Sequence, residues 1–168
     1  YAPRVAALEA LFTTIAHTRM AGVPVMNLAL RVQALGFEPL PLPLQQGEAP
    51  AAPAPAAAVG ILITPWFMNL VRLPLQPEPA AQGVGRSQRH AVGNGVFDFI
   101  GAHEPAIGAY SACSLFSPVF EFVDQAAARA TAQAVLATLR AAAPQASEPP
   151  PARRAFLLGR SAARGAAA

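Results

Sequence analysis

The chain has few residues of the kinds that bind metals or carry out catalysis. Among its 168 residues there are one cysteine, three histidines and no lysine. The single cysteine, Cys113, excludes an intrachain disulfide and any metal site built from paired cysteines. His17, His90 and His103 are scattered along the chain, and so are the nine acidic residues. The sequence therefore predicts no metal site, no cofactor and no catalytic residues.

A hydrophobic run long enough to cross a membrane is also lacking, since a spanning helix needs about 20 apolar residues. The best candidate is the run 61–75 (ILITPWFMNLVRLPL), which contains two prolines and Arg72 and is too short. Residues 1–20 carry charges and lack the continuous apolar stretch of a signal peptide. We therefore expect neither a signal peptide nor membrane insertion.

Low-complexity sequence accounts for much of the hydrophobic composition. Hydrophobic residues make up 54% of the chain, but many are alanines that bury little surface. The clearest such stretch is the Pro/Ala-rich segment 45–58, which we expect to be a solvent-exposed connection. The length of the chain predicts one domain. We assign this domain to residues 1–160 and a flexible tail to residues 161–168.

Basic residues gather near the C-terminus. Four of the twelve arginines lie there with no acidic residue among them: Arg153, Arg154, Arg160 and Arg164. A site for single-stranded nucleic acid combines basic residues with aromatic side chains, and here the aromatic residues lie elsewhere. We therefore interpret the arginines as part of a solvated terminus and expect no nucleic-acid binding.

Hydrophobic periodicity predicts two helices, at residues 4–20 and 124–141, with Asp124 as the N-cap of the second. The sequence GNG at residues 93–95 predicts a tight hairpin turn. Strands are expected at residues 30–37, 60–64, 68–73, 87–92, 96–102 and 106–116. Strands framed by an N-terminal and a C-terminal helix indicate a single α+β domain with an antiparallel sheet.

The apolar run 61–75 is divided by Pro65, which cannot donate a hydrogen bond within a central strand. The sequence therefore predicts a buried strand before this proline and a bend that carries Trp66, the only tryptophan. Periodicity alone leaves two interpretations of Trp66 open. It is either part of the core or part of a surface that binds another protein, where tryptophan and methionine are enriched.

Four segments, in their order along the chain, resemble one family. They are LFTTIAHTRMAGVPV (11–25), GILITPWFMNLVRLPL (60–75), YSACSLFSPVFEFVDQAAARATAQAVL (110–136) and RRAFLLGR (153–160). The combination resembles the HybE/HupJ family of [NiFe]-hydrogenase assembly chaperones. The resemblance extends over about residues 5–160, apart from the Pro/Ala-rich connection, and it rests on the set of segments together.

The resemblance implies a cytoplasmic, non-enzymatic α+β protein. Its partner would be the precursor of the small or the large hydrogenase subunit, held before assembly or export, with other maturation proteins as further partners. The positions that match the family motifs are Thr64, Pro65, Trp66, Met68, Asn69, Tyr110, Cys113, Ser114, Ser117, Pro118, Arg153, Arg154, Gly159 and Arg160. We take the partner-binding residues to be Thr64, Pro65, Trp66, Phe67, Met68, Asn69, Cys113, Ser114, Ser117 and Pro118. Their centre would be an apolar patch around Trp66, Phe67 and Met68.

Two other functions stay open at this point. Cys113 and a histidine would serve a protein that handles metals or clusters, although Cys113 lies among small residues, as an inert buried thiol does. A small-molecule enzyme would need a polar site assembled from distant residues, with His90 or His103 at its centre.

Overall fold

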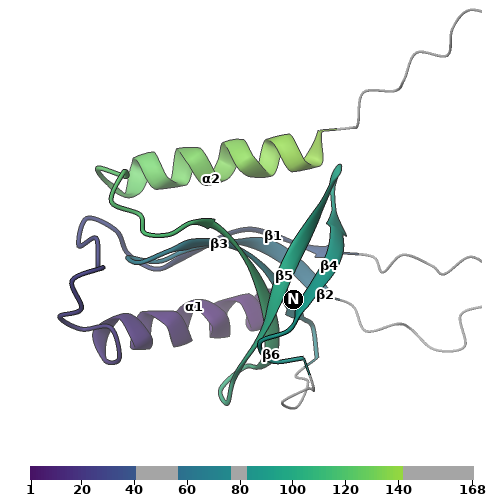
Figure 1. The fold of residues 1–168 in the computed structure, drawn as a ribbon, viewed down its shortest axis with the longest axis horizontal. Helices are drawn as coiled ribbons and strands as arrows, with labels where there is room; N and C mark the ends of the chain where they lie inside the picture. The colour runs from purple at the N-terminus through teal and green to yellow at the C-terminus, as the bar shows by residue number, and fades with distance from the viewer. Residues whose placement is uncertain (41–56, 77–82, 142–168) are drawn as a thin grey trace, which may run out of the picture.

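The computed structural model describes residues 1–40, 57–76 and 83–141. The segment 153–160, the tail 161–168 and most of the Pro/Ala-rich connection lie outside these ranges. The elements are α1 (Ala2–His17), β1 (Gln33–Leu40), β2 (Ala57–Ile63), β3 (Met68–Pro74), β4 (Ser87–Val92), β5 (Gly95–Glu104), β6 (Gly108–Phe116) and α2 (Gln125–Arg140). The six strands form one antiparallel sheet in the order β1-β2-β3-β6-β5-β4 (Figure 1). The predicted α+β class, with an N-terminal and a C-terminal helix, is confirmed.

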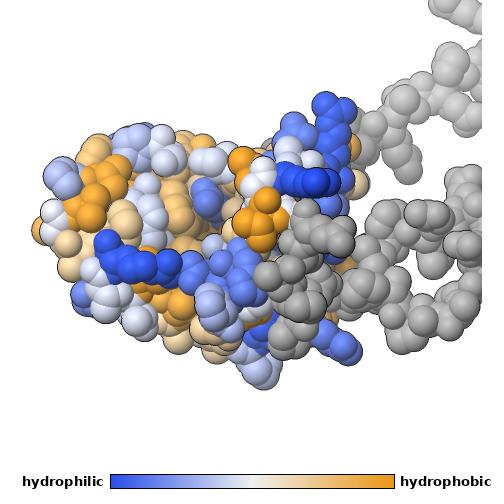
Figure 2. Space-filling model, turned by 60° about the horizontal axis from the view of Figure 1, so that its bottom comes forward, coloured by the Kyte–Doolittle hydropathy of each residue, from blue (hydrophilic) through white to orange (hydrophobic). Residues whose placement is uncertain are grey.

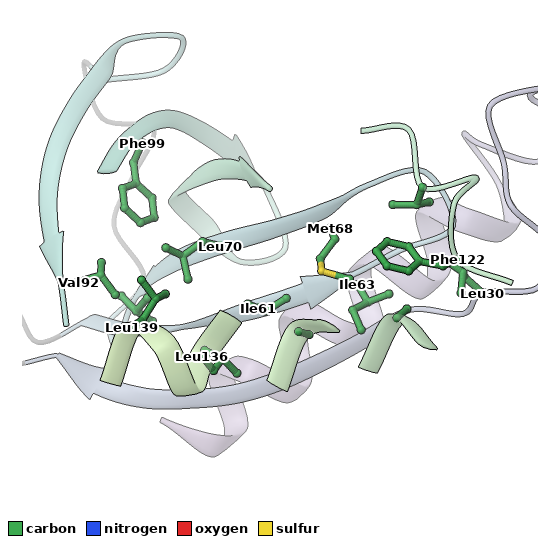
Figure 3. Close-up of a cluster of buried hydrophobic side chains, with 14 residues drawn as sticks. Leu30, Ile61, Ile63, Met68, Leu70, Val92, Phe99, Phe122, Leu136 and Leu139 are labelled. Atoms are coloured by element: carbon green, nitrogen blue, oxygen red, sulfur yellow. The ribbon is translucent and has the colours of Figure 1, made fainter. Parts of the chain in front are cut away.

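The two helices lie on opposite faces of the sheet (Figure 1). Alternate residues of a strand point to opposite faces, so β2 supplies side chains to both layers. Leu62 packs with Phe12 on the side of α1, whereas Ile61 packs with Leu136 on the side of α2 (Figure 3). Every residue of β2 is therefore buried. We call the two resulting clusters the α1-side core and the α2-side core.

Both helices form where the hydrophobic pattern predicted them. Helix α1 buries Leu8, Phe12 and Ile15 as one stripe, but it ends at His17, three residues earlier than predicted. In α2, the Asp124 carboxylate accepts a hydrogen bond of 2.8 Å from the backbone N–H of Ala127, as expected for an N-cap. The residues that α2 buries in the core are Ala128, Ala132, Leu136 and Leu139.

The starts predicted for two strands, β2 and β1, were wrong. Ala57 and Ala58 are buried residues of β2, paired with Pro74 and Leu73 of β3, although they were expected in the exposed connection. The alanine-rich composition of this segment suggested an exposed linker. Small side chains, however, also fit a strand that is covered on both faces. Strand β1 begins at Gln33 rather than at residue 30.

The hairpin between β4 and β5 turns within the predicted GNG sequence, but Gly95 already belongs to β5. Val92 pairs with Gly95, so the turn residues are Gly93 and Asn94, and Gly93 has the positive φ of 58°. The tip of this hairpin contacts the C-terminal end of α2. The Asn94 amide donates hydrogen bonds to the carbonyl oxygens of Thr138 (2.9 Å) and Ala141 (3.2 Å), and its backbone N–H donates to Leu139 (3.0 Å).

Gly60 is required by the packing of Phe37 on the α1 side of the sheet. A Cβ atom at Gly60 would overlap the Phe37 ring and lie 2.8 Å from the carbonyl oxygen of Leu35. We predict that Gly60→Ala lowers the free energy of unfolding by about 1–3 kcal/mol, the usual cost of overpacking a core. Denaturant unfolding measures this change. Gly83→Ala is the control, because its nearest neighbour would lie 3.9 Å away; equal stability of the two variants would contradict the packing role.

Candidate functional site

The predicted partner-binding residues gather at one end of the sheet. Three connections meet there: the α1–β1 loop (18–32), the β2–β3 turn (64–67) and the β6–α2 loop (117–124), on the left of Figure 1. We call this region the loop end. The β2–β3 turn and the β6–α2 loop lie within the second and third stretches that carry the family resemblance, and the first stretch (11–25) covers part of the α1–β1 loop. Segments far apart in the sequence thus form one surface.

Thr64 holds the β2–β3 turn closed. Its backbone N–H donates to the carbonyl oxygen of Phe67 (2.8 Å), and its hydroxyl donates to the same oxygen (3.0 Å). The hydroxyl oxygen also accepts hydrogen bonds from the N–H groups of Phe67 (3.0 Å) and Trp66 (3.3 Å). Pro65 lies in the turn, where its missing N–H leaves no strand partner unpaired. Thr64 and Pro65 are both buried, so they act by shaping the turn.

Asn27 joins the three connections of the loop end. Its backbone N–H donates to the carbonyl oxygen of Pro65 (2.7 Å) in the β2–β3 turn. Its side-chain amide donates to the carbonyl oxygens of Val119 (3.0 Å) and Phe122 (2.8 Å) in the β6–α2 loop. The side-chain oxygen accepts from the N–H of Ala29 (3.1 Å). One residue therefore makes hydrogen bonds to both other connections and holds the three together.

Large apolar side chains protrude from the two loops that Asn27 holds together. The exposed fractions are 88% for Leu28, 58% for Phe120 and 80% for Val123. We call the hydrogen bonds of Asn27 the Asn27 network. Each of the three exposed residues is next in sequence to a residue of this network, so its backbone position is fixed while its side chain faces solvent. Figure 2 shows hydrophobic surface at the left end of the molecule, where the loop end lies. Sequence reasoning missed these three residues, because no local pattern separates an exposed leucine from a buried one.

Trp66 and Phe67 belong to an aromatic cluster on the α1 side. Phe12 stacks on Trp66, with 6.3 Å between ring centroids, and meets Phe67 (5.8 Å) and Tyr110 (6.2 Å) edge to face. Trp66 and Phe67 also pack edge to face at 5.4 Å. Both are half-buried. Trp66 is thus neither wholly core nor wholly surface: one part is held by Phe12 and the rest is accessible.

Met68 does not join these two residues. Its side chain has no exposed surface and lies in the α2-side core beside Ile63 (Figure 3). Phe67 and Met68 are consecutive residues, and at the start of β3 their side chains reach opposite faces of the sheet. The apolar patch expected from the sequence therefore loses Met68 and keeps Trp66 and Phe67.

The remaining predicted residues flank this region on β3 and β6. Asn69 pairs with Ser114 in the ladder between the two strands, which brings two of the family segments together. Ser114, Ser117 and Pro118 are exposed. Cys113 is half-buried and packs against the α2-side core, rather than being fully buried as expected.

A groove of about 270 Å³ opens beside the aromatic cluster. Phe12 and Phe67 form one side, Val71 and Ala112 contribute from the sheet, and Ile100 lies on β5. Tyr110 also lines it, and burial, with a smaller contribution from the charge of Glu104, raises the pKa of its phenol to about 12. Its phenol is therefore neutral at neutral pH, and none of the lining side chains is charged. The groove suits apolar groups rather than proton transfer.

The described residues offer little for metal binding or catalysis. Within residues 1–40, 57–76 and 83–141, no three His, Cys, Asp or Glu side chains gather closely enough to hold a metal ion. Burial, and secondarily the charge of Asp98, raises the pKa of the Cys113 thiol. Burial and the charge of Arg72 lower the pKa of His90. In the part of the chain that is described, no helix has both the length and the hydropathy needed to span a membrane.

The Asn27 network makes a prediction about stability. We expect Asn27→Ala to lower the free energy of unfolding by about 2–4 kcal/mol, because two partly buried carbonyl groups lose their donor. Asn94→Ala is a matched control, since Asn94 also donates to two carbonyl oxygens but at an exposed position. Water replaces the lost donor there, so a loss of about 1 kcal/mol is expected. Equal losses for the two variants in denaturant unfolding would show that Asn27 is an ordinary surface residue.

The raised pKa of Cys113 makes a prediction about reactivity. A thiol whose pKa is raised stays protonated at neutral pH, and only the thiolate is nucleophilic. We expect iodoacetamide to alkylate Cys113 more slowly than a free cysteine peptide at neutral pH, with the rate rising as the pH increases. Asp98→Asn removes a negative charge that raises the pKa, so it should speed alkylation modestly. Alkylation faster than that of the free peptide would reveal an activated thiolate and favour a metal-handling role.

Comparison with known proteins agrees with the resemblance of the motif segments. The family model described as "[NiFe]-hydrogenase assembly, chaperone, HybE" matches residues 3–159. The chain is 47% identical to Protein HoxT of Cupriavidus necator, over 94% of this chain and 89% of that protein. It is 36% identical to hydrogenase expression/formation protein HupJ of Bradyrhizobium diazoefficiens, over 79% of this chain and 69% of that protein.

One solved structure shares the fold. The solution structure of HybE from Escherichia coli superposes with a TM-score of 0.57 and covers 95% of this chain and 91% of that one. The identity of 21% means that this likeness bears on the fold alone. The family match covers nearly the whole chain, and the sequence relatives are well above that level of identity. The chain belongs to the HybE family of non-enzymatic chaperones that act in [NiFe]-hydrogenase maturation.

Proposed function

We propose that the chain binds an immature [NiFe]-hydrogenase subunit in the cytoplasm through its loop end. The main support for this proposal is that three apolar side chains, Leu28, Phe120 and Val123, are exposed on loops that Asn27 holds together. Trp66 and Phe67 extend this surface along the α1 side. Either the small or the large subunit precursor is a possible partner, before the subunit is assembled or exported.

Apolar burial supplies the binding energy of such a surface. Each Å² of apolar surface removed from water contributes about 25 cal/mol, so a few large side chains are enough for reversible holding. Loops that are ordered before binding lose less conformational entropy when the partner arrives. The Asn27 and Thr64 hydrogen bonds thus contribute to affinity although neither side chain needs to touch the partner.

A chaperone must distinguish an immature subunit from the assembled enzyme. A ligand shifts a conformational equilibrium only by its differential affinity for the two states. Apolar surface of a subunit that is exposed before assembly becomes buried against its neighbours afterwards. The loop end, with its leucine, valine and aromatic side chains, therefore binds the immature subunit. It loses this binding site on the subunit as assembly proceeds.

The proposal predicts which variants fail to capture the partner. An affinity-tagged chain is expressed in cells that carry the hydrogenase genes, with maturation blocked, and the captured subunits are quantified by mass spectrometry. We expect the triple variant Leu28→Ser, Phe120→Ser, Val123→Ser to capture at least about tenfold less subunit, since each side chain contributes more than 1 kcal/mol when buried. We expect Trp66→Ala to have a smaller effect, because only part of Trp66 is accessible.

Val84→Ser is the control, because Val84 is 55% exposed but lies on the segment before β4, outside the loop end. Thermal unfolding of each variant separates lost binding from lost folding. Capture by the triple variant at the level of the unmodified chain, with its fold intact, would reject the loop end as the binding surface.

A further inference from the structure

Strand β5 has one buried face and one face that no helix of the described chain covers. Phe97 and Phe99 point into the α2-side core, whereas the alternate residues Val96 and Ile100 are exposed on the side of α1. The α1-side core takes its strand residues from β1, β2, β3 and β6, and none from β5. The groove beside Phe12 and Phe67 lies where α1 ends its cover of the sheet, and Ile100, which is 56% exposed, lines it.

Asn69, which lines this groove, has a polar side-chain atom without a partner. Its side-chain oxygen is buried and has no hydrogen-bond partner, although Asn69 is one of the groove residues. A buried acceptor without a donor costs about 1–3 kcal/mol. The last torsion of an asparagine side chain has a broad energy profile. A small rotation of the amide, rather than a full turn that would bury its NH₂ group, would bring the oxygen towards a donor that enters the groove. An apolar groove with one unpaired acceptor is complementary to an apolar group next to one N–H.

We infer that this groove holds a single bulky apolar side chain of the immature hydrogenase subunit, with a free backbone N–H beside it donating to Asn69 Oδ1. The inference rests on the proposed function and adds which feature of the partner is recognised. A charged donor such as an ammonium group fits poorly, because none of the lining side chains is charged and a desolvated charge needs a counter-ion.

The free N–H makes the groove selective for chain that is not yet folded. In folded proteins more than 90% of buried backbone N–H groups are already paired. A segment that offers both an exposed apolar side chain and an unpaired N–H is therefore one that has not entered its final helix or sheet. When the segment folds, it withdraws the side chain and the donor together, and release requires no separate energy source.

The test uses the full chain and peptides that tile both hydrogenase subunits. The indole N–H resonance of Trp66, the only tryptophan, reports groove occupancy, because Trp66 contacts Phe12 and Phe67 of the groove wall. For each peptide that shifts this resonance, every backbone nitrogen is methylated in turn. We expect methylation at one position to weaken binding about tenfold, as for the loss of one hydrogen bond.

Asn69→Leu tests whether that hydrogen bond ends on Asn69. In this variant the methylated and unmethylated peptides should bind equally, which makes a double-mutant cycle. The variant should be as stable as the unmodified chain or more stable, because an unpaired buried oxygen is removed. A purely structural role of Asn69 would instead lower stability. Ile100→Ser should weaken peptide binding, whereas Val84→Ser, with a nearly equal exposed fraction of 55%, should not.

Two results would overturn the inference. One is that N-methylation of the peptide changes its affinity equally for the unmodified chain and for Asn69→Leu, or changes neither affinity. The other is capture of the whole precursor by the loop end while no peptide shifts the Trp66 resonance. This second result leaves the proposed function standing, whereas failure to capture any hydrogenase subunit would reject the proposed function itself.

Discussion

The amide of Asn27 is the interaction on which the loop end depends. The Asn27 backbone N–H donates to the carbonyl oxygen of Pro65, and its side-chain NH₂ group donates to two carbonyl groups more than ninety residues away. Without this amide the α1–β1 loop would lose its hydrogen bonds to Val119 and Phe122 in the β6–α2 loop. The spacing of the exposed side chains on the two loops would then no longer be fixed by these bonds. The Gln125 side chain, at the start of α2, also accepts from the N–H of Arg31 in the α1–β1 loop (2.9 Å) and donates to the side-chain oxygen of Gln33 at the start of β1 (2.9 Å).

Local chemistry was enough to predict much of the fold. The stripe of Leu8, Phe12 and Ile15, the Asp124 cap and the break at Pro65 all follow from neighbouring residues, and the structure has each of them. The errors arose where the decision was not local. Whether Ala57 and Ala58 form a linker or a strand depends on β3, which lies beyond the turn, and the Asn27 contacts depend on a loop that follows the last strand.

The candidate site was only partly predictable for the same reason. The family resemblance pointed to the β2–β3 turn and the β6–α2 loop, but motif membership does not separate residues that build a turn from residues that are exposed. Thr64 and Pro65 build the turn, Met68 fills the opposite core, and Trp66 is shared between core and surface. The period of two in an extended chain already implies that Phe67 and Met68 face opposite ways. Because both faces of the sheet are covered, this alternation places Met68 in one core when Phe67 lies against the other.

The contact between the β4–β5 hairpin and α2 determines where the rest of the chain begins. Asn94 binds the last carbonyl groups of α2, so Ala141 is anchored at the end of the helix opposite to Asp124 and the loop end. A helix of 16 residues is about 24 Å long, so α2 separates the hairpin contact from Asp124 by about this distance. Asn94 thus fixes the far end of α2 while Asp124 caps its near end, so both ends of the helix are held by side chains outside it.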